Sequence, residues 1–321
     1  MNTMHETTTR PEGWDVIGDV HGEAAKLEGL LAAMGYTDDG RSWRHPTRRA
    51  IFVGDLIDRG PQQAKVVAIA RTMVAGGHAQ VVAGNHEFNA IGFATPHRQG
   101  DDYCRPHSEK NRKQHQRYLD EIGWESALHG EHLDWFRSLS PTVEVDGLRV
   151  VHACWDDASL ARLGPLLSDD GGFTDALIHA ATEKGSEPWQ AIEHLLKGPE
   201  IPIPRPYDFP KGTPRHNARL QWWNPDAERL DEAVWIPGGA TEADGSPYVL
   251  VDDSPVASPV DPYRSTIPVI VGHYWFRGDP APCSPNVACV DYSAAKGGPL
   301  VAYRWSGETE LTAANFTAFN C

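Results

Sequence analysis

Three short segments that begin with glycine decide how this sequence folds: Gly18-Asp-Val-His-Gly22, Gly54-Asp-Leu-Ile-Asp-Arg-Gly60 and Gly84-Asn-His-Glu87. Each follows a brief apolar run that is typical of a buried strand, the first of them Trp14–Ile17. Glycine lets the backbone turn sharply and approach a ligand closely. Because open α/β sheets place their sites beyond the carboxyl ends of strands, we expect the polar side chains of these segments to meet at one edge.

The rest of the chain continues the alternation of strands and helices. Apolar residues recur at helical spacing within 27–34 and 66–73, and further helices are expected at 105–125 and 132–139. Strand-like runs occur between these helices and toward the end of the chain, at 51–53, 81–83, 148–151, 269–271, 287–290 and 300–303. The pattern predicts an α/β fold in which helices pack against a sheet.

The segment at about 156–263 differs from the rest because it is rich in proline and glycine. It contains one well-marked helix. Pro188 is a favoured residue in the first turn of this helix, and Gly198-Pro199 is expected to end it. The segment is too long for a plain loop. We therefore expect a single domain over 1–321, with this segment as an elaborated insertion that covers one end of the sheet.

Composition limits the possible classes of protein. The 321 residues are 40% hydrophobic and 23% charged, with a net charge of −15. This acidic balance argues against stable nucleic-acid binding, although a metal pair would still attract a small anion. The five scattered cysteines include no C-x-x-C pair, so a disulfide framework and a thiolate zinc site are not expected. No run approaches the roughly 18 apolar residues of a membrane span, and we expect a cytoplasmic protein without membrane contact.

The polar residues of the three segments are expected to converge at one edge of the sheet: Asp19, His21, Asp55, Asp58, Arg59, Asn85 and His86. The Asp, His and Asn side chains among them form a ligand set for hard metal ions. Carboxylate, imidazole and amide ligands suit Mn, Fe or Zn. A single Gly-Asp pair after a strand is more often a turn or a helix cap. Three such segments in order, each after a strand, make that structural alternative a poor explanation.

In these motifs the chain resembles the calcineurin-like metallophosphoesterase superfamily. Within the superfamily it resembles the phosphoprotein phosphatase branch, which includes bacterial serine/threonine phosphatases and diadenosine tetraphosphatases. Val150-Val-His-Ala153 and Gly272-His273 fit two further motifs, and the resemblance extends over about 14–305. It implies two mixed β-sheets packed as a sandwich with flanking helices. It also implies two metal ions (Mn, Fe or Zn), whose ligands would be Asp19, His21, Asp55, Asn85, His152 and His273, with Asp55 shared.

The resemblance further implies that a metal-bridging hydroxide attacks phosphorus while His86, oriented by Asp58, protonates the leaving oxygen. The alternative is that His86 and Asp58 only cap local turns. Arg59 is the expected phosphate clamp because guanidinium offers a rigid fork to two oxygens. For a second clamp within the insertion we favour Arg219 over Arg215, although an ion pair with a surface acid explains either arginine slightly better.

Two departures from the family pattern affect the substrate. Ala153-Cys-Trp-Asp156 follows the fourth motif, where glycine or Ala-Gly is usual, and Tyr274-Trp-Phe-Arg277 follows His273, where dinucleotide hydrolases have Thr-Pro. The tryptophans near these motifs either stack on a substrate or pack the core of the insertion: Trp155, Trp222, Trp223 and Trp275. Cys154 is expected to be inert, and Asp291 either orients a ligand or occupies a turn.

The sequence thus predicts a metal-dependent phosphoester hydrolase, with a phosphomonoesterase of the phosphoprotein phosphatase type as the leading interpretation. A dinucleoside polyphosphate hydrolase is the second interpretation, and a metal-binding scaffold without turnover is a remote third. The expected substrate is a phosphorylated small molecule, a nucleotide or a phosphoprotein.

Overall fold

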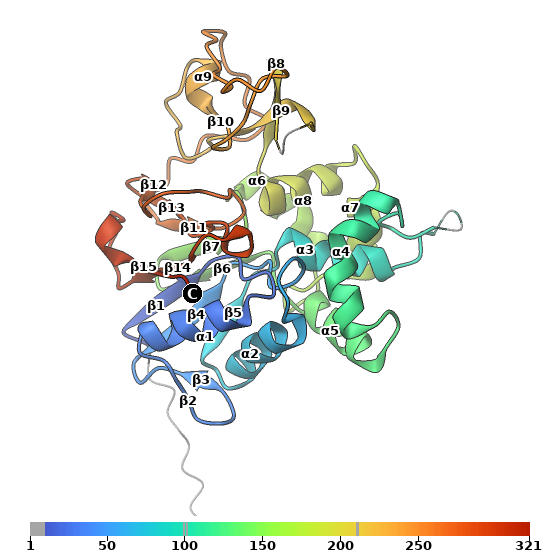
Figure 1. The fold of residues 1–321 in the computed structure, drawn as a ribbon, viewed down its shortest axis with the longest axis vertical. Coiled ribbons are helices and arrows are strands. Elements are labelled where there is room, and N and C mark those ends of the chain that lie inside the picture. The colour runs from blue at the N-terminus through green and yellow to red at the C-terminus, as the bar shows by residue number, and fades with distance from the viewer. Residues whose placement is uncertain (1–9, 99, 101, 210–211) are drawn as a thin grey trace, which may run out of the picture.

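Two five-stranded sheets form the centre of the computed structural model, which describes residues 10–98, 100, 102–209 and 212–321 (Figure 1). The first sheet has the order β15-β14-β1-β4-β5 and the second β12-β13-β11-β7-β6. The strands of the first are β1 (Gly13–Ile17), β4 (Arg48–Phe52), β5 (Ala79–Val81), β14 (Leu300–Trp305) and β15 (Phe316–Phe319). Those of the second are β6 (Thr142–Val145), β7 (Leu148–Val151), β11 (Val269–Val271), β12 (Pro282–Ser284) and β13 (Val287–Cys289).

An apolar layer joins the two sheets face to face. Along β4 the side chains alternate, because Ile51 belongs to this layer whereas Ala50 and Phe52 belong to the core on the opposite face. Val150 of β7 and Ile270 of β11 reach the layer from the second sheet. The sandwich of two mixed sheets that the family resemblance implied is therefore confirmed.

Helices cover the outer faces of the sandwich. The first five are α1 (Ala24–Ala33), α2 (Gln63–Ala75), α3 (Asn85–Ala94), α4 (Glu109–Ile122) and α5 (Ala127–Arg137). The expected helix at 132–139 begins earlier because Ser126 accepts a hydrogen bond from the backbone of His129 at 3.0 Å and caps α5. Helix α3 was not predicted, because its first turn coincides with the third glycine segment.

The segment at about 156–263 contains more regular structure than the sequence indicated. The expected helix is α8 (Glu187–Lys197), and α6 (Asp157–Leu163), η1 (Gly164–Leu166), α7 (Asp175–Thr182) and α9 (Leu230–Ala233) add to it. A three-stranded sheet follows, formed by β8 (Glu200–Asp208), β9 (Pro214–Leu220) and β10 (Val234–Trp235). Figure 1 shows this sheet with α9 as a lobe beyond the two large sheets. That the segment is an insertion within one domain stays a prediction.

Smaller elements complete the described chain. They are β2 (Thr37–Asp38), β3 (Trp43–Arg44), η2 (Ala294–Lys296) and η3 (Ala313–Asn315). Among the helices in the described residues, none combines the length and the apolar character that crossing a bilayer requires.

Candidate metal centre and acid–base site

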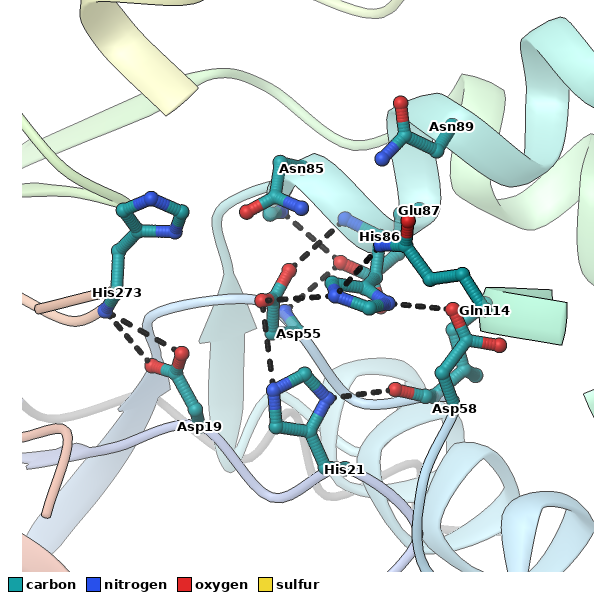
Figure 2. Close-up of polar contacts among 12 residues, drawn as sticks. Asp19, His21, Asp55, Asp58, Asn85, His86, Glu87, Asn89, Gln114 and His273 are labelled. Atoms are coloured by element: carbon teal, nitrogen blue, oxygen red, sulfur yellow. Dashed lines mark hydrogen bonds and ion pairs between the residues drawn. The ribbon is translucent and has the colours of Figure 1, made fainter. Parts of the chain in front are cut away.

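The candidate site lies where strands of both sheets end. Strands β1, β4 and β5 run parallel in the first sheet, and β7, β11 and β13 run parallel in the second. The loop or helix after each of five strands supplies the predicted residues: Asp19 and His21 after β1, Asp55, Asp58 and Arg59 after β4, Asn85 and His86 after β5, His152 after β7, and His273 after β11. Figure 2 shows the first sheet's carboxylates and imidazoles turned toward one another, with His273 opposite them.

The backbone of these loops is unusually constrained. Among the described non-glycine residues with positive φ, five are predicted site residues with φ between 48° and 70°: His21, Asp55, Asp58, Arg59 and His273. Such conformations cost free energy and concentrate at functional sites. Gly54 has φ +92°, and a Cβ atom there would lie 2.2 Å from the backbone nitrogen of Gly84. Glycine therefore permits the second and third segments to approach.

Asp55 is the centre of the candidate metal site. Its Oδ2 lies 3.6 Å from Nε2 of His21, 3.4 Å from Nε2 of His152 and 3.8 Å from Nε2 of His86. Two groups of ligand atoms, each within 4.8 Å, share this aspartate: His21, Asp55 and His86, and Asp55, His152 and His273. One carboxylate common to two groups is the geometry that a pair of cations requires.

Hydrogen bonds on the far side of two imidazoles leave their Nε2 atoms free for a cation. Nδ1 of His21 donates to the carbonyl of Ile57 at 2.8 Å, and Nδ1 of His152 donates to the carbonyl of Val53 at 2.7 Å. Such bonds fix the tautomer of metal-binding histidines. Both ring nitrogens of His273 are buried and lack a hydrogen-bond partner in the described structure, a cost that a bound cation would remove.

The remaining two candidate ligands lie beside these histidines. Oδ1 of Asn85 is 3.2 Å from Nε2 of His152, and both carboxylate oxygens of Asp19 lie within 3.3 Å of the backbone nitrogen of His273. A Cβ atom on Gly272 would lie 2.1 Å from Oδ1 of Asp19, so glycine is needed there. The six predicted ligands thus lie together, and their donor atoms fit divalent cations.

Electrostatics also favour bound cations. Burial raises the pKa of Asp19 well above its usual value, and the neighbouring charge of Asp291 raises it further. Burial lowers the pKa of His152, but the charges of Asp55 and Asp19 and the hydrogen bonds of this imidazole together outweigh burial and raise the pKa to about 10. Several buried carboxylates that raise one another's pKa form a site that cations would stabilise.

His86 and Asp58 form the candidate acid–base pair. Nδ1 of His86 hydrogen-bonds Oδ2 of Asp58, and Nδ1 of His115 donates to the other oxygen at 2.8 Å. Burial alone would raise the pKa of Asp58, but the charge of His86 and the two hydrogen bonds outweigh burial and lower it. Asp58 therefore stays ionised. His115 was missed because it lies 57 positions away on the polar helix α4, without a motif.

Glu87, the last residue of the third motif, holds the loops together. Its carboxylate is fully buried and accepts hydrogen bonds from the backbone nitrogens of Asp55, Leu56 and Gly84 at 2.8, 2.8 and 3.0 Å. These bonds attach the loop after β4 to the first turn of α3. The fixed backbone determines where Asp55 and His86 point.

The arginines predicted to bind phosphate occupy different surroundings. Burial and the charge of His86 lower the pKa of His21, and Arg59 lies close enough to lower it further. Arg219 lies half-buried on β9, with its guanidinium 4.5 Å from the ring centroid of Trp275, and its charge lowers the pKa of His273 after burial. Arg215 is exposed and donates to the carbonyl of Phe209 at 3.3 Å, which ties it to the β8–β9 turn.

The four tryptophans near the motifs that differ from the family pattern divide into two groups. Trp155, Trp222 and Trp223 are buried and pack within the core, and Nε1 of Trp222 donates to the carbonyl of Ala153 at 3.1 Å. Trp275 is half-buried, and Nζ of Lys296 lies 4.7 Å from its ring centroid. Of the four, Trp275 has the placement that a contact with substrate requires.

Asp291 and Cys154 lie close to the candidate site and have defined surroundings. Asp291 accepts hydrogen bonds from the backbone nitrogens of Trp275 and Ser293, each at 2.9 Å, and thereby fixes the loop that follows His273. Cys154 is buried, and burial raises the pKa of its thiol well above the usual value. A thiol with a raised pKa carries little reactive thiolate.

Replacement of Arg59 by alanine tests the phosphate clamp. We expect Arg59→Ala to weaken inhibition by inorganic phosphate about 10- to 100-fold, because charge-assisted hydrogen bonds contribute roughly 1.5–3 kcal/mol. Metal content, measured by mass spectrometry, should stay at the wild-type value. Arg41→Ala, at an exposed turn, is the matched control. Unchanged inhibition by phosphate in Arg59→Ala would reject the clamp.

Two clusters of buried imidazoles and carboxylates that share one aspartate are typical of dinuclear metallohydrolases. A family model described as calcineurin-like phosphoesterase matches residues 15–237. The chain belongs to the calcineurin-like phosphoesterase family. As a class, these proteins are hydrolases that act on phosphoester bonds.

Individual relatives match a shorter part of the chain. An asymmetrical bis(5'-nucleosyl)-tetraphosphatase, PrpE, of Oceanobacillus iheyensis is 42% identical over 73 residues, which is 22% of this chain and 29% of that protein. The PrpE of Halalkalibacterium halodurans is 43% identical over 74 residues, 23% of this chain and 30% of that protein. The matches thus span less than a third of either relative.

A solved structure resembles the whole fold. A protein serine/threonine phosphatase from Saccharomyces cerevisiae, with similarity to human phosphatase PP5, has a TM-score of 0.51. The match covers 98% of this chain and 82% of that chain, at 13% sequence identity. At this identity the likeness concerns the fold alone.

Proposed function

We propose that the protein removes a terminal phosphoryl group from a phosphate monoester, with water as the acceptor and His86 as the proton donor. The observation that carries this proposal is the orientation of His86. Its Nδ1 is hydrogen-bonded to the ionised Asp58, and its Nε2 faces Asp55, at 3.8 Å, in the shared centre of the ligand groups. A proton on Nε2 therefore points to the position where a phosphate would be held.

The residues of the chain divide the chemistry between them. Asp19, His21, Asp55, Asn85, His152 and His273 would hold two ions of Mn, Fe or Zn. Bound there, these ions would polarise the phosphoryl oxygens and lower the pKa of water. Asp58 stabilises the protonated imidazole of His86, and His115 holds Asp58 in place. Arg59 and Arg219 are the proposed partners of the oxygens that do not react.

A dinucleoside polyphosphate is the second candidate substrate. The segment shared with the two PrpE proteins, whose names state a tetraphosphatase activity, supports it. A metal-binding scaffold without turnover finds less support, because His86 and Asp58 have the contacts that a proton donor requires.

Metal analysis and chelation test the proposal directly. We expect purified protein to carry close to two transition-metal ions. A chelator should abolish hydrolysis and lower the Tm by several degrees, since a ligand at 100 times its Kd stabilises a protein by about 2.7 kcal/mol. Added Mn should restore both. Folded, metal-free protein that stays inactive toward p-nitrophenyl phosphate and phosphopeptides after Mn is added would contradict the proposal.

A further inference from the structure

A cavity of about 180 Å³ lies between α3, the segment before α4, α7 and α8, and its residue Arg105 connects to the proposed proton donor through Gln114. Its volume corresponds to roughly six waters at about 30 Å³ each, enough for a phosphate and part of the group attached to it. Asn89, Arg105 and Lys197 give it a polar side, and Phe88 and Trp189 an apolar side.

Two sets of contacts connect this cavity to the candidate site. Asn89 lies one turn after His86 on α3, so both side chains occupy the same face of the helix. Nε2 of Gln114 lies 3.4 Å from Nε2 of His86, and Figure 2 shows Asn89 farther along the same helix. On the other side, Lys197 accepts a hydrogen bond from Arg219 through its carbonyl, at 3.1 Å.

Of the residues that line the cavity, Arg105 is the one that indicates a ligand. Its guanidinium is half-buried and donates to the amide oxygens of Asn89 and of Gln114, the latter at 3.0 Å. In the part of the chain that the structure describes, no carboxylate forms an ion pair with it. Glu193, the acid that lines the cavity, pairs with Lys197 instead. Burial lowers the pKa of Arg105, and the more distant charges of Asp58 and Glu193 offset this effect only in part. An anionic ligand in contact with the half-buried guanidinium would offset it further.

The direction of proton transfer identifies which part of a substrate would occupy the cavity. The proton on Nε2 of His86 goes to the leaving oxygen, so the leaving group lies on that side of the phosphorus. On this side, Gln114 lies beside Nε2 of His86, and Arg105 donates a hydrogen bond to Gln114. The cavity is therefore positioned for the leaving group and not for the phosphoryl group that reacts.

We propose that this cavity binds a leaving group that is itself a phosphate, with Arg105 as its countercharge, so that phosphoanhydrides are the preferred substrates. The inference rests on the proposed function and refines its substrate. Water forms a bond to the terminal phosphorus, the bond to the bridging oxygen breaks, and the electron pair stays on that oxygen. The leaving phosphate thereby gains negative charge beside Arg105. Phe88 and Trp189 provide an apolar wall for an attached nucleoside.

The test compares two classes of substrate in the metal-loaded, full-length protein. ADP and inorganic pyrophosphate provide a phosphate leaving group, and p-nitrophenyl phosphate and a phosphoserine peptide do not. We expect Arg105→Ala to lower the ratio of kcat/KM for the anhydrides to kcat/KM for the monoesters about 10- to 100-fold. Most of the change should appear in KM, because Arg105 is a binding residue. Comparison of the two anhydrides shows whether the nucleoside of ADP contributes to binding.

Two variants control for indirect effects. Arg117→Ala removes an exposed arginine of α4 and should leave the ratio unchanged. Arg105→Lys keeps the charge without the fork and should recover part of the ratio, provided that the cavity binds an anion. Equal losses on both substrate classes in Arg105→Ala, or an unchanged ratio, would overturn the inference and leave the proposed function intact. Failure of the wild-type protein on all four substrates would instead overturn the proposed function.

Discussion

Asp55→Asn should abolish most of the activity and remove metal from the protein. The substitution keeps the size of the side chain and tolerates the positive φ of 50° at this position, because asparagine adopts this conformation readily. It removes the charge that both ligand groups share. Residues that only orient ligands typically contribute 10- to 100-fold, so we expect kcat/KM to fall by more than about 100-fold.

The metal content of the same variant distinguishes a ligand from a residue with another role. Mass spectrometry should find clearly fewer than two ions per chain, whereas circular dichroism should match that of the wild type. Asp39→Asn, in the exposed turn between β2 and β3, is the matched control and should bind metal normally. Two ions per chain in Asp55→Asn, with normal turnover, would exclude Asp55 as the shared ligand.

The parts of the fold that repeat a local pattern could be predicted from sequence. Strand β4 combines an apolar run with a glycine turn, and the structure confirms the strand, which pairs parallel with β1. The glycine segments also predicted which side chains would meet, because strand ends at one edge bring them together. His152 and His273 come from the second sheet, so their proximity depended on the family resemblance and not on local signals.

The features that the sequence did not reveal depend on contacts between distant segments. His115 reaches Asp58, and Arg105 reaches Gln114, from a region of polar residues with no marked periodicity or motif. The long hairpin of β8 and β9 was also missed, since its strands carry prolines and exposed polar residues in place of an apolar alternation. In each case partner residues, not the segment itself, determine the structure.

His86→Asn should separate substrates by the quality of their leaving groups. A serine or alkyl alkoxide leaves poorly without a proton, so hydrolysis of a phosphoserine peptide should fall about 10²- to 10⁴-fold. Hydrolysis of p-nitrophenyl phosphate should fall far less, because nitrophenolate is a stable anion. Measured kcat values for both substrates, with Mn present, provide the comparison, and His78→Asn, in the turn before β5, is the matched control.

Metal content decides between the two roles that the geometry of His86 permits. Its Nε2 lies within 4.8 Å of the ligand atoms of His21 and Asp55, so a metal-binding role would also place it there. A proton donor predicts two ions per chain in His86→Asn and a selective loss on poor leaving groups. Equal losses on both substrates, together with a lost ion, would instead make His86 a ligand. The proton donor that we propose corresponds to the first result.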